Sequence, residues 1–130
     1  MRRLISFMSI SLDGYFADED SGMAWAHRGG DDPEWNAFVA GNASGGGTLV
    51  FGRTTYDMMA AYWPTPMAAQ QNPDVARHMN RADKRVFSRK LKKAAWNNTT
   101  LVKGEIGAAV RRLKKSAGPG MAILGSGSIV

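Results

Sequence analysis

The chain contains no cysteine among its 130 residues and only two histidines. Without cysteine there is no disulfide bond and no thiolate metal site, and a reducing compartment is the simpler expectation. The two histidines, His27 and His78, are far apart and lack the spacing typical of zinc ligands, so no metal site is predicted. The lysine motif of phosphate-binding loops and the nucleophile elbow of serine hydrolases are also missing, which disfavours both of those enzyme classes.

Long apolar runs are missing as well. Residues 4–12 are too short and too polar to span a membrane, and they lack the cleavage pattern of a secretory signal. Apolar residues make up 44% of the chain and charged residues 22%, which is ordinary for a soluble globular protein. We therefore expect a cytoplasmic protein without a membrane partner, and one domain over residues 1–130 with a buried core.

Acidic side chains are scarce in the second part of the chain. Residues 1–80 contain 5 basic and 9 acidic side chains, a net charge of −4, whereas residues 81–130 contain 12 basic and 2 acidic ones, a net charge of +10. Such a region suits an anionic ligand, either a nucleic acid or a cofactor that carries phosphate, although a solvated basic surface would give the same count.

Segments with strand and helix patterns alternate along the chain. Helical spacing or capping signals predict helices that begin at Asp32-Pro33 and over residues 53–63, 74–82 and 104–118, while residues 64–73 break the pattern. Apolar and β-branched runs predict strands at residues 2–12, 48–52, 84–88, 99–103 and 120–125. This order predicts an α/β fold with parallel crossovers, in which ligands bind beyond the carboxyl ends of the strands.

The turn after the second predicted strand has the residues of a phosphate site. Gly52 would let the backbone approach a ligand closely. The exposed amides at the start of the following helix, at Thr54 and Thr55, would donate hydrogen bonds to a phosphate. Arg53 would add a charged fork for a phosphate. The alternative is an ordinary turn in which a threonine caps the helix and Arg53 faces water.

Two further strand ends carry suitable residues. Ser88, Arg89 and Lys90 could hold a second phosphate, the group that distinguishes NADPH from NADH, or could form a basic surface turn. Gly125, Ser126, Gly127 and Ser128 resemble half of a dinucleotide fingerprint, although the same residues suit a flexible turn. We expect the three turns, at residues 52–55, 88–90 and 125–128, to converge on one ligand, and NADPH to bind more tightly than NADH.

Read together, these motifs resemble the dihydrofolate reductase-like family, and most closely its branch with the reductase domain of bacterial riboflavin biosynthesis proteins. The resemblance rests on "SLDGYFADEDSGMAW", "FGRTTYDMMAAYWP", "VFSRKL", "LVKG" and "ILGSGSIV", in this order, and covers nearly the whole chain. It implies a three-layer fold with a mixed, mostly parallel sheet flanked by helices, a cytoplasmic homodimer, and NADPH as cofactor. Because the family continues with a helix and further strands, we expect the C-terminal part of the fold to be incomplete.

The resemblance also implies roles for residues near the first strand. Residues 10–14, among them Ile10 and Gly14, would line the nicotinamide, and Asp13 would contact the substrate. The family's carboxylate on the first helix is matched by Asp32, which would hold the substrate or supply a proton, while its position before Pro33 equally suits a helix cap. Asp31 and Glu34 are rivals for that role. Trp25 is a candidate substrate contact because it lies beside a long loop at residues 15–32.

The sequence thus predicts an NADPH-dependent oxidoreductase that transfers a hydride to a small heterocyclic or aldose-like substrate, of the riboflavin-precursor or dihydrofolate reductase type. Two alternatives remain: a nucleotide-binding domain without catalysis, and a nucleic-acid-binding domain that uses the basic residues 81–115 with Phe87 and Trp96 as stacking groups. No aromatic RNA-binding signature supports the last, so a nucleic acid is not the expected partner.

Overall fold

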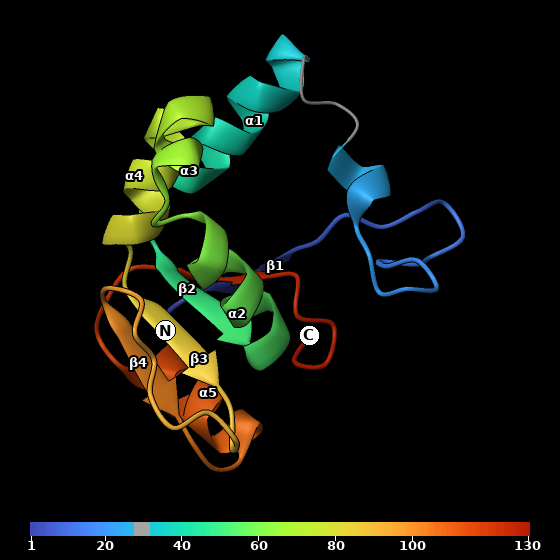
Figure 1. Cartoon of the computed structure of the whole chain (residues 1–130). Helices are drawn as coiled ribbons and strands as arrows, with labels where there is room; N and C mark the ends of the chain where they lie inside the picture. The colour runs from blue at the N-terminus through green and yellow to red at the C-terminus, as the bar shows by residue number, and fades with distance from the viewer. Residues whose placement is uncertain (28–31) are drawn as a thin grey trace.

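The computed structural model describes residues 1–27 and 32–130 and joins five strands of these residues into one sheet (Figure 1). The strands lie in the order β1-β5-β2-β3-β4, and all four pairings between the described strands are parallel. Their bounds are β1 Leu4–Phe7, β2 Thr48–Gly52, β3 Lys84–Phe87, β4 Thr99–Val102 and β5 Met121–Leu124. The first strand is therefore shorter than the predicted run of residues 2–12.

Helices connect most of these strands. The described helices are η1 Ala24–His27, α1 Pro33–Ser44, α2 Arg53–Tyr62, α3 Pro66–Gln71, α4 Pro73–Arg81 and α5 Ile106–Lys115. The prediction that residues 64–73 break the helical pattern was wrong, because α3 lies there. Its start follows from local chemistry: the Thr65 side chain accepts a hydrogen bond from the amide of Ala68, and Pro66 occupies the first turn.

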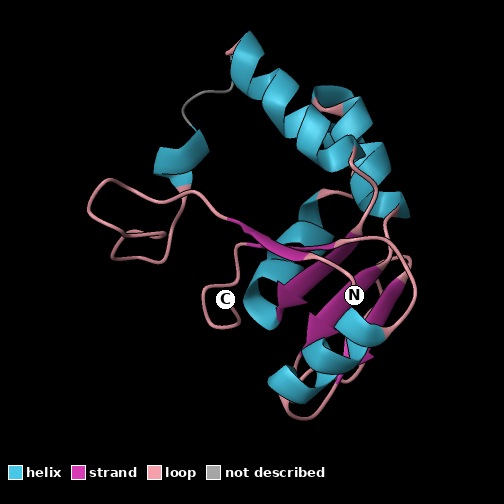
Figure 2. Ribbon diagram, turned by 180° about the vertical axis from the view of Figure 1, so that it is seen from behind, coloured by secondary structure: helices cyan, strands magenta, loops and turns pink. Residues whose placement is uncertain are grey.

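The central strands β2 and β3 are buried on both faces, which gives three layers there. Phe51 and Val86 pack with Tyr56 of α2 on one face, whereas Val50 and Phe87 pack with residues of α5 on the other. Figures 1 and 2 show α2 and α5 on opposite sides of the strands, while α1, α3 and α4 lie together beyond one end of α2. The prediction of a mostly parallel sheet flanked by helices is confirmed. Among the described residues, no helix is long and apolar enough to cross a membrane.

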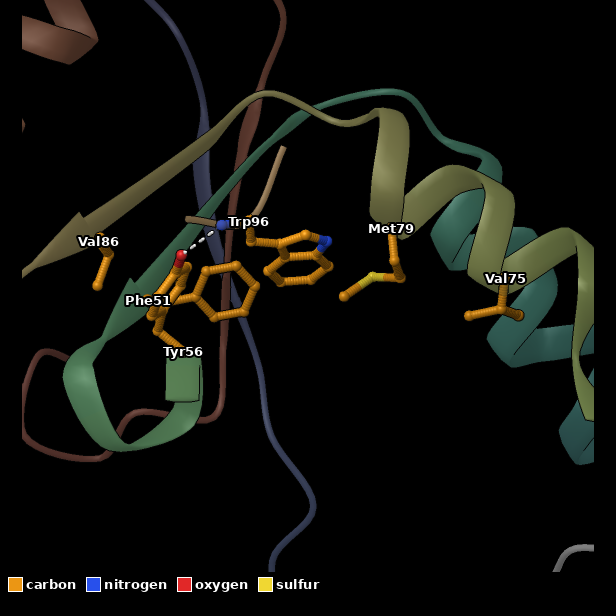
Figure 3. Close-up of a cluster of buried hydrophobic side chains, with 6 residues drawn as sticks. All are labelled: Phe51, Tyr56, Val75, Met79, Val86 and Trp96. Carbon is orange, nitrogen blue, oxygen red and sulfur yellow. Dashed lines mark hydrogen bonds between the residues drawn. The ribbon is translucent and has the colours of Figure 1, made fainter. Parts of the chain in front are cut away.

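Aromatic rings form the centre of the core on the α2 face (Figure 3). The ring centroids of Phe51 and Tyr56 each lie 6.1 Å from that of Trp96. The backbone amide of Trp96 also donates a hydrogen bond of 3.1 Å to the Tyr56 hydroxyl. Because these contacts join β2, α2 and the segment before β4, they fix α2 against the sheet and thereby orient its first turn.

A buried lysine stands beside this core. The Lys84 ammonium donates hydrogen bonds to the carbonyl oxygens of Asn80 at 3.2 Å, Ala82 at 2.7 Å and Asn97 at 2.9 Å, and lies 4.4 Å from the centre of the Trp96 ring. The side chain is fully buried. Burial lowers the pKa of Lys84 to about 8. Lys84 therefore joins the end of α4 and the segment before β4 to the start of β3.

We expect Lys84→Met to reduce the free energy of unfolding at pH 7 by about 2–3 kcal/mol, because three buried carbonyl groups lose their donor. Between about pH 8 and 10.5 the unfolded chain holds a proton that folded Lys84 has released, so the stability of the wild type should rise with pH in this window. That rise should be missing in the variant. Denaturant unfolding at several pH values measures both effects, with the exposed Lys93→Met as the control. Equal pH profiles for wild type and Lys84→Met would contradict the prediction.

Candidate cofactor-binding site

The turns that follow β2, β3 and β5 border one open cavity of about 1980 Å³, which extends along the sheet as far as Asp83 and Gly120 near the amino ends of the strands. These strands are neighbours in a parallel sheet, so their carboxyl ends meet at the same edge. The cavity wall includes every candidate residue of the three turns, namely Gly52, Arg53, Thr54, Thr55, Ser88, Arg89, Lys90, Gly125, Ser126, Gly127 and Ser128. The structure therefore brings together segments that lie up to 76 positions apart in the sequence.

The first turn offers the open end of α2. Gly52 occupies the N-cap position and no side chain caps the helix, so the amides of the first helical turn have no partner within the helix. Arg53 follows at once, and its guanidinium lies 3.1 Å from the carboxylate of Asp57. Both side chains of this pair are about half exposed. The turn thus combines free amide donors with a cation that already has a partner.

The turn at residues 125–128 is bonded directly to the first one. The amide of Gly52 donates a hydrogen bond of 2.9 Å to the Ser126 hydroxyl, and the amide of Ser126 donates one of 3.1 Å to the Thr55 hydroxyl. Gly125 and Ser126 both adopt the left-handed region, with φ of 57° and 60°, which glycine tolerates and other residues rarely adopt. Three residues predicted to bind the cofactor, Gly52, Thr55 and Ser126, therefore hydrogen-bond between the two turns.

The turn at residues 88–90 carries two exposed cations. The Ser88 hydroxyl accepts a hydrogen bond of 3.0 Å from the amide of Leu91, which shapes the turn. Arg89 and Lys90 are exposed. Within the described part of the chain, no ion pair involves either side chain. These two cations can therefore receive an anion without first losing a carboxylate partner.

A loop covers part of the 125–128 turn. The ring of Phe16 lies so close to Gly127 that a methyl group there would come within 2.6 Å of Phe16 Cζ. Residues 8–27 are otherwise held by internal turns, in which Ser11 bonds to Tyr15 and Asp18 bonds to Gly22. Among the described residues, no hydrogen bond joins residues 8–27 to the rest of the chain. The Phe16 ring is thus one point at which this loop lies against the 125–128 turn.

Five other predicted site residues are not among the described residues that line the cavity, namely Ile10, Asp13, Gly14, Trp25 and Asp32. Ile10 is 62% exposed, and the Asp13 carboxylate accepts a hydrogen bond from the hydroxyl of Ser11 within the loop. The carboxylate of Asp32 accepts hydrogen bonds from the amides of Glu34 and Trp35. Asp32 therefore has the capping role that its position before Pro33 allowed. Asp31, a rival for its catalytic role, lies outside the described residues.

An apolar wall of the cavity was missed by the sequence analysis. It consists of Ile5 and Phe7 of β1 with Trp35 of α1, and the ring of Phe38 lies 5.7 Å from that of Trp35 and 6.0 Å from that of Phe7. Helix α1 has no buried residue, so its aromatic face is not covered by the sheet. The helical spacing of Trp35, Phe38 and Val39 signalled an apolar face but could not show that this face borders a cavity.

Comparison with known proteins identifies the relationship of the chain. The model of the family described as "RibD C-terminal domain" matches residues 2–130. Among solved structures, the crystal structure of a "Putative riboflavin biosynthesis protein" from Shewanella sp. PV-4 is similar, with a TM-score of 0.56 and 20% sequence identity. The likeness covers 98% of this chain and 66% of that one, so the chain spans just under two thirds of its length. No curated protein matches the chain.

We expect Asp32→Ala to lower the free energy of unfolding by about 1 kcal/mol, because two amides at the start of α1 lose their acceptor. Asp32→Ser should keep most of this stability, since a serine hydroxyl also caps helices. Thermal or urea unfolding of both variants measures the effect. An Asp32→Ala protein as stable as the wild type would contradict the capping role.

We expect Gly127→Ala to release the 8–27 loop, because the new methyl group would displace the Phe16 ring. Amide hydrogen exchange of peptides within residues 8–27 should become faster, while exchange in the strands should stay the same. Gly41→Ala is the matched control, since a methyl group at Gly41 would meet no atom within 4 Å. Unchanged exchange of the loop in Gly127→Ala would show that this contact does not hold it.

Proposed function

The chain belongs to the RibD C-terminal domain family, and from this membership we propose that it is an NADPH-dependent reductase of a small heterocyclic substrate, of the type that riboflavin biosynthesis requires. The observation that carries the proposal is that the three turns, at residues 52–55, 88–90 and 125–128, follow neighbouring parallel strands and border the same cavity. Parallel α/β sheets bind dinucleotides at such an edge. The homodimer and the cytoplasmic location remain predictions.

The residues of the three turns fit a dinucleotide that carries three phosphates. The free amides at the start of α2 and the Arg53 guanidinium would hold the diphosphate, since helix amino ends and guanidinium groups both bind phosphate. Ser88, Arg89 and Lys90 would hold the 2′-phosphate at the neighbouring strand end. The glycine-containing turn at residues 125–128 would let the cofactor pass close to the backbone.

The two groups of cations would make different contributions to cofactor choice. Arg53 is partly neutralised by Asp57, and the diphosphate that it would contact is common to NADH and NADPH. Arg89 and Lys90 have no ion-pair partner within the described chain. We therefore assign the preference for NADPH mainly to Arg89 and Lys90, since a charged hydrogen bond contributes more when the cation is not already compensated.

The apolar wall suits the flat ring of a heterocyclic substrate. Phe7 and Trp35 border the cavity, and aromatic rings pack favourably against other flat rings. The wall also includes Ile5 and Val39, and Ser6 and Asn42 supply polar side chains beside them. The heterocycle would thus lie between α1 and β1, beside the turns that hold the cofactor.

The bound nicotinamide would supply a hydride to an electrophilic carbon of the substrate. The chain itself would bind and orient both molecules and exclude water. The Phe16 ring and the 8–27 loop would close the cavity beside the 125–128 turn. Asp83 is the only carboxylate among the described residues that line the cavity, and it lies at the start of β3, where it pairs with Arg85 at 2.6 Å. A structural role therefore accounts for Asp83.

We expect NADPH to bind at least about tenfold more tightly than NADH, because two cations without an ion-pair partner would bind the 2′-phosphate that NADH lacks. The double variant Arg89→Gln/Lys90→Gln should weaken NADPH binding about tenfold or more and leave NADH binding within about twofold. Arg53→Gln should weaken both cofactors to a similar extent. Titration of tryptophan fluorescence or calorimetry measures these affinities.

Lys92→Gln is the control for this experiment, because Lys92 is an exposed lysine in the same segment and does not border the cavity. It should leave both affinities unchanged. Equal affinity of the wild type for NADPH and NADH would refute the assignment of the 2′-phosphate to Arg89 and Lys90. Failure to bind either cofactor, with no oxidation of NADPH in the presence of pyrimidine or pteridine substrates, would overturn the proposed function.

A further inference from the structure

The 52–55 and 125–128 turns are joined by the Thr55–Ser126 bridge, by which we mean the two hydrogen bonds from the Ser126 amide to Thr55 and from the Gly52 amide to Ser126. Their lengths are 3.1 and 2.9 Å. The turns also touch: a methyl group at Gly125 would lie 3.6 Å from Thr55, and one at Gly52 would lie 3.5 Å from Ser126. Each turn thus positions the other.

The hydrogen-bonding groups of Ser126 are already used within the protein. Its hydroxyl accepts from the amide of Gly52 and donates to the carbonyl oxygen of Leu124 at 3.3 Å. Its amide is used by Thr55. With hydroxyl and amide both engaged within the protein, Ser126 has no donor left for a phosphate.

The backbone conformation agrees with this positioning role. Ser126 has φ of 60° although it is not glycine, and such a conformation persists only where its surroundings fix it. The bridge supplies that constraint from both sides of the residue. A third hydrogen bond, of 2.9 Å from the amide of Ile129 to the carbonyl oxygen of Ser126, closes the turn itself.

We infer that Thr55 and Ser126 are positioning residues that set the separation of the two turns, an inference that rests on the proposed function. A dinucleotide that contacts both turns gains affinity over its separate halves only if the turns are held at the matching distance. The bridge provides this fixed distance. It thereby gives Thr55 and Ser126 a positioning role that differs from the cofactor contact predicted for both from the sequence.

The test compares the whole cofactor with its two halves. Calorimetry would measure the affinities of NADPH, adenosine 2′,5′-bisphosphate and reduced nicotinamide mononucleotide, since the two fragments together carry all the phosphates of NADPH. Thr55→Val removes the acceptor of the Ser126 amide and keeps the shape of the side chain. It should weaken NADPH binding about tenfold, the equivalent of about 1.4 kcal/mol, and change the affinity of each fragment by less than about twofold.

Two further variants complete the design. Thr55→Ser keeps the hydroxyl group and should restore the affinity of NADPH. Ser126→Ala removes the acceptor of the Gly52 amide from the other turn and should repeat the effect of Thr55→Val, which also covers the case that Thr55→Val does not fold. Amide hydrogen exchange without any nucleotide should show faster exchange at Ser126 in Thr55→Val and at Gly52 in Ser126→Ala.

Two results would contradict the positioning role of Thr55 and Ser126. A fragment that weakens as much as NADPH would mean that Thr55 contacts a phosphate directly, and an unchanged affinity for NADPH would mean that the bridge sets no distance that matters. Either result would overturn the inference and leave the proposed function standing. If the wild type binds none of the three compounds, the proposed function fails together with the positioning role, and amide exchange alone then reports whether the bridge exists.

Discussion

The parallel pairing of β2 with both β3 and β5 is the constraint on which the candidate site depends. It brings the carboxyl ends of three strands to one edge, although the turns that follow them come from distant parts of the sequence. The pairing is supported on both faces, by Phe51 and Val86 toward α2 and by Val50 and Phe87 toward α5. Removal of either apolar layer would therefore disturb the site without any change in the residues that form it.

The two edges of the sheet are organised differently. At the amino ends of the strands, buried cations are fully engaged: Arg2 donates to the carbonyl oxygen of Pro119 and to the Thr48 hydroxyl, both at 2.6 Å, and Lys84 donates to three carbonyl groups. At the carboxyl ends, Arg89 and Lys90 are exposed and have no carboxylate partner within the described chain. One edge is thus closed by internal hydrogen bonds, while the other carries exposed cations. The basic residues of 81–130 are divided between these two edges, which the composition alone could not show.

Sequence patterns predicted the parallel sheet and the three turns well because these features depend on local signals. The run at residues 48–52 is β2 to the residue, and the spacing of Asp32 and Pro33 marked the start of α1. The same patterns failed where contacts with other parts of the chain decide the local structure. The predicted break at residues 64–73 contains α3, because Pro66 and Pro73 begin helices there rather than interrupt one. Ile10 and Asp13 were assigned by resemblance alone and stay predictions, and neither is among the described residues that line the cavity.

The roles of individual side chains were the hardest to predict, because a hydrogen-bonding group can be used by the protein before a ligand arrives. Thr55 and Ser126 have the residue types that bind phosphate, yet each is bonded to the neighbouring turn. Arg53 likewise has Asp57 beside it, whereas Arg89 has no such partner in the described chain. A list of suitable residues therefore contains both groups that can contact a cofactor and groups that hold the contacting ones in place. Only the geometry separates them: the amides at the start of α2 and the cations after β3 stay open to a ligand, whereas the amide and hydroxyl of Ser126 are engaged within the protein.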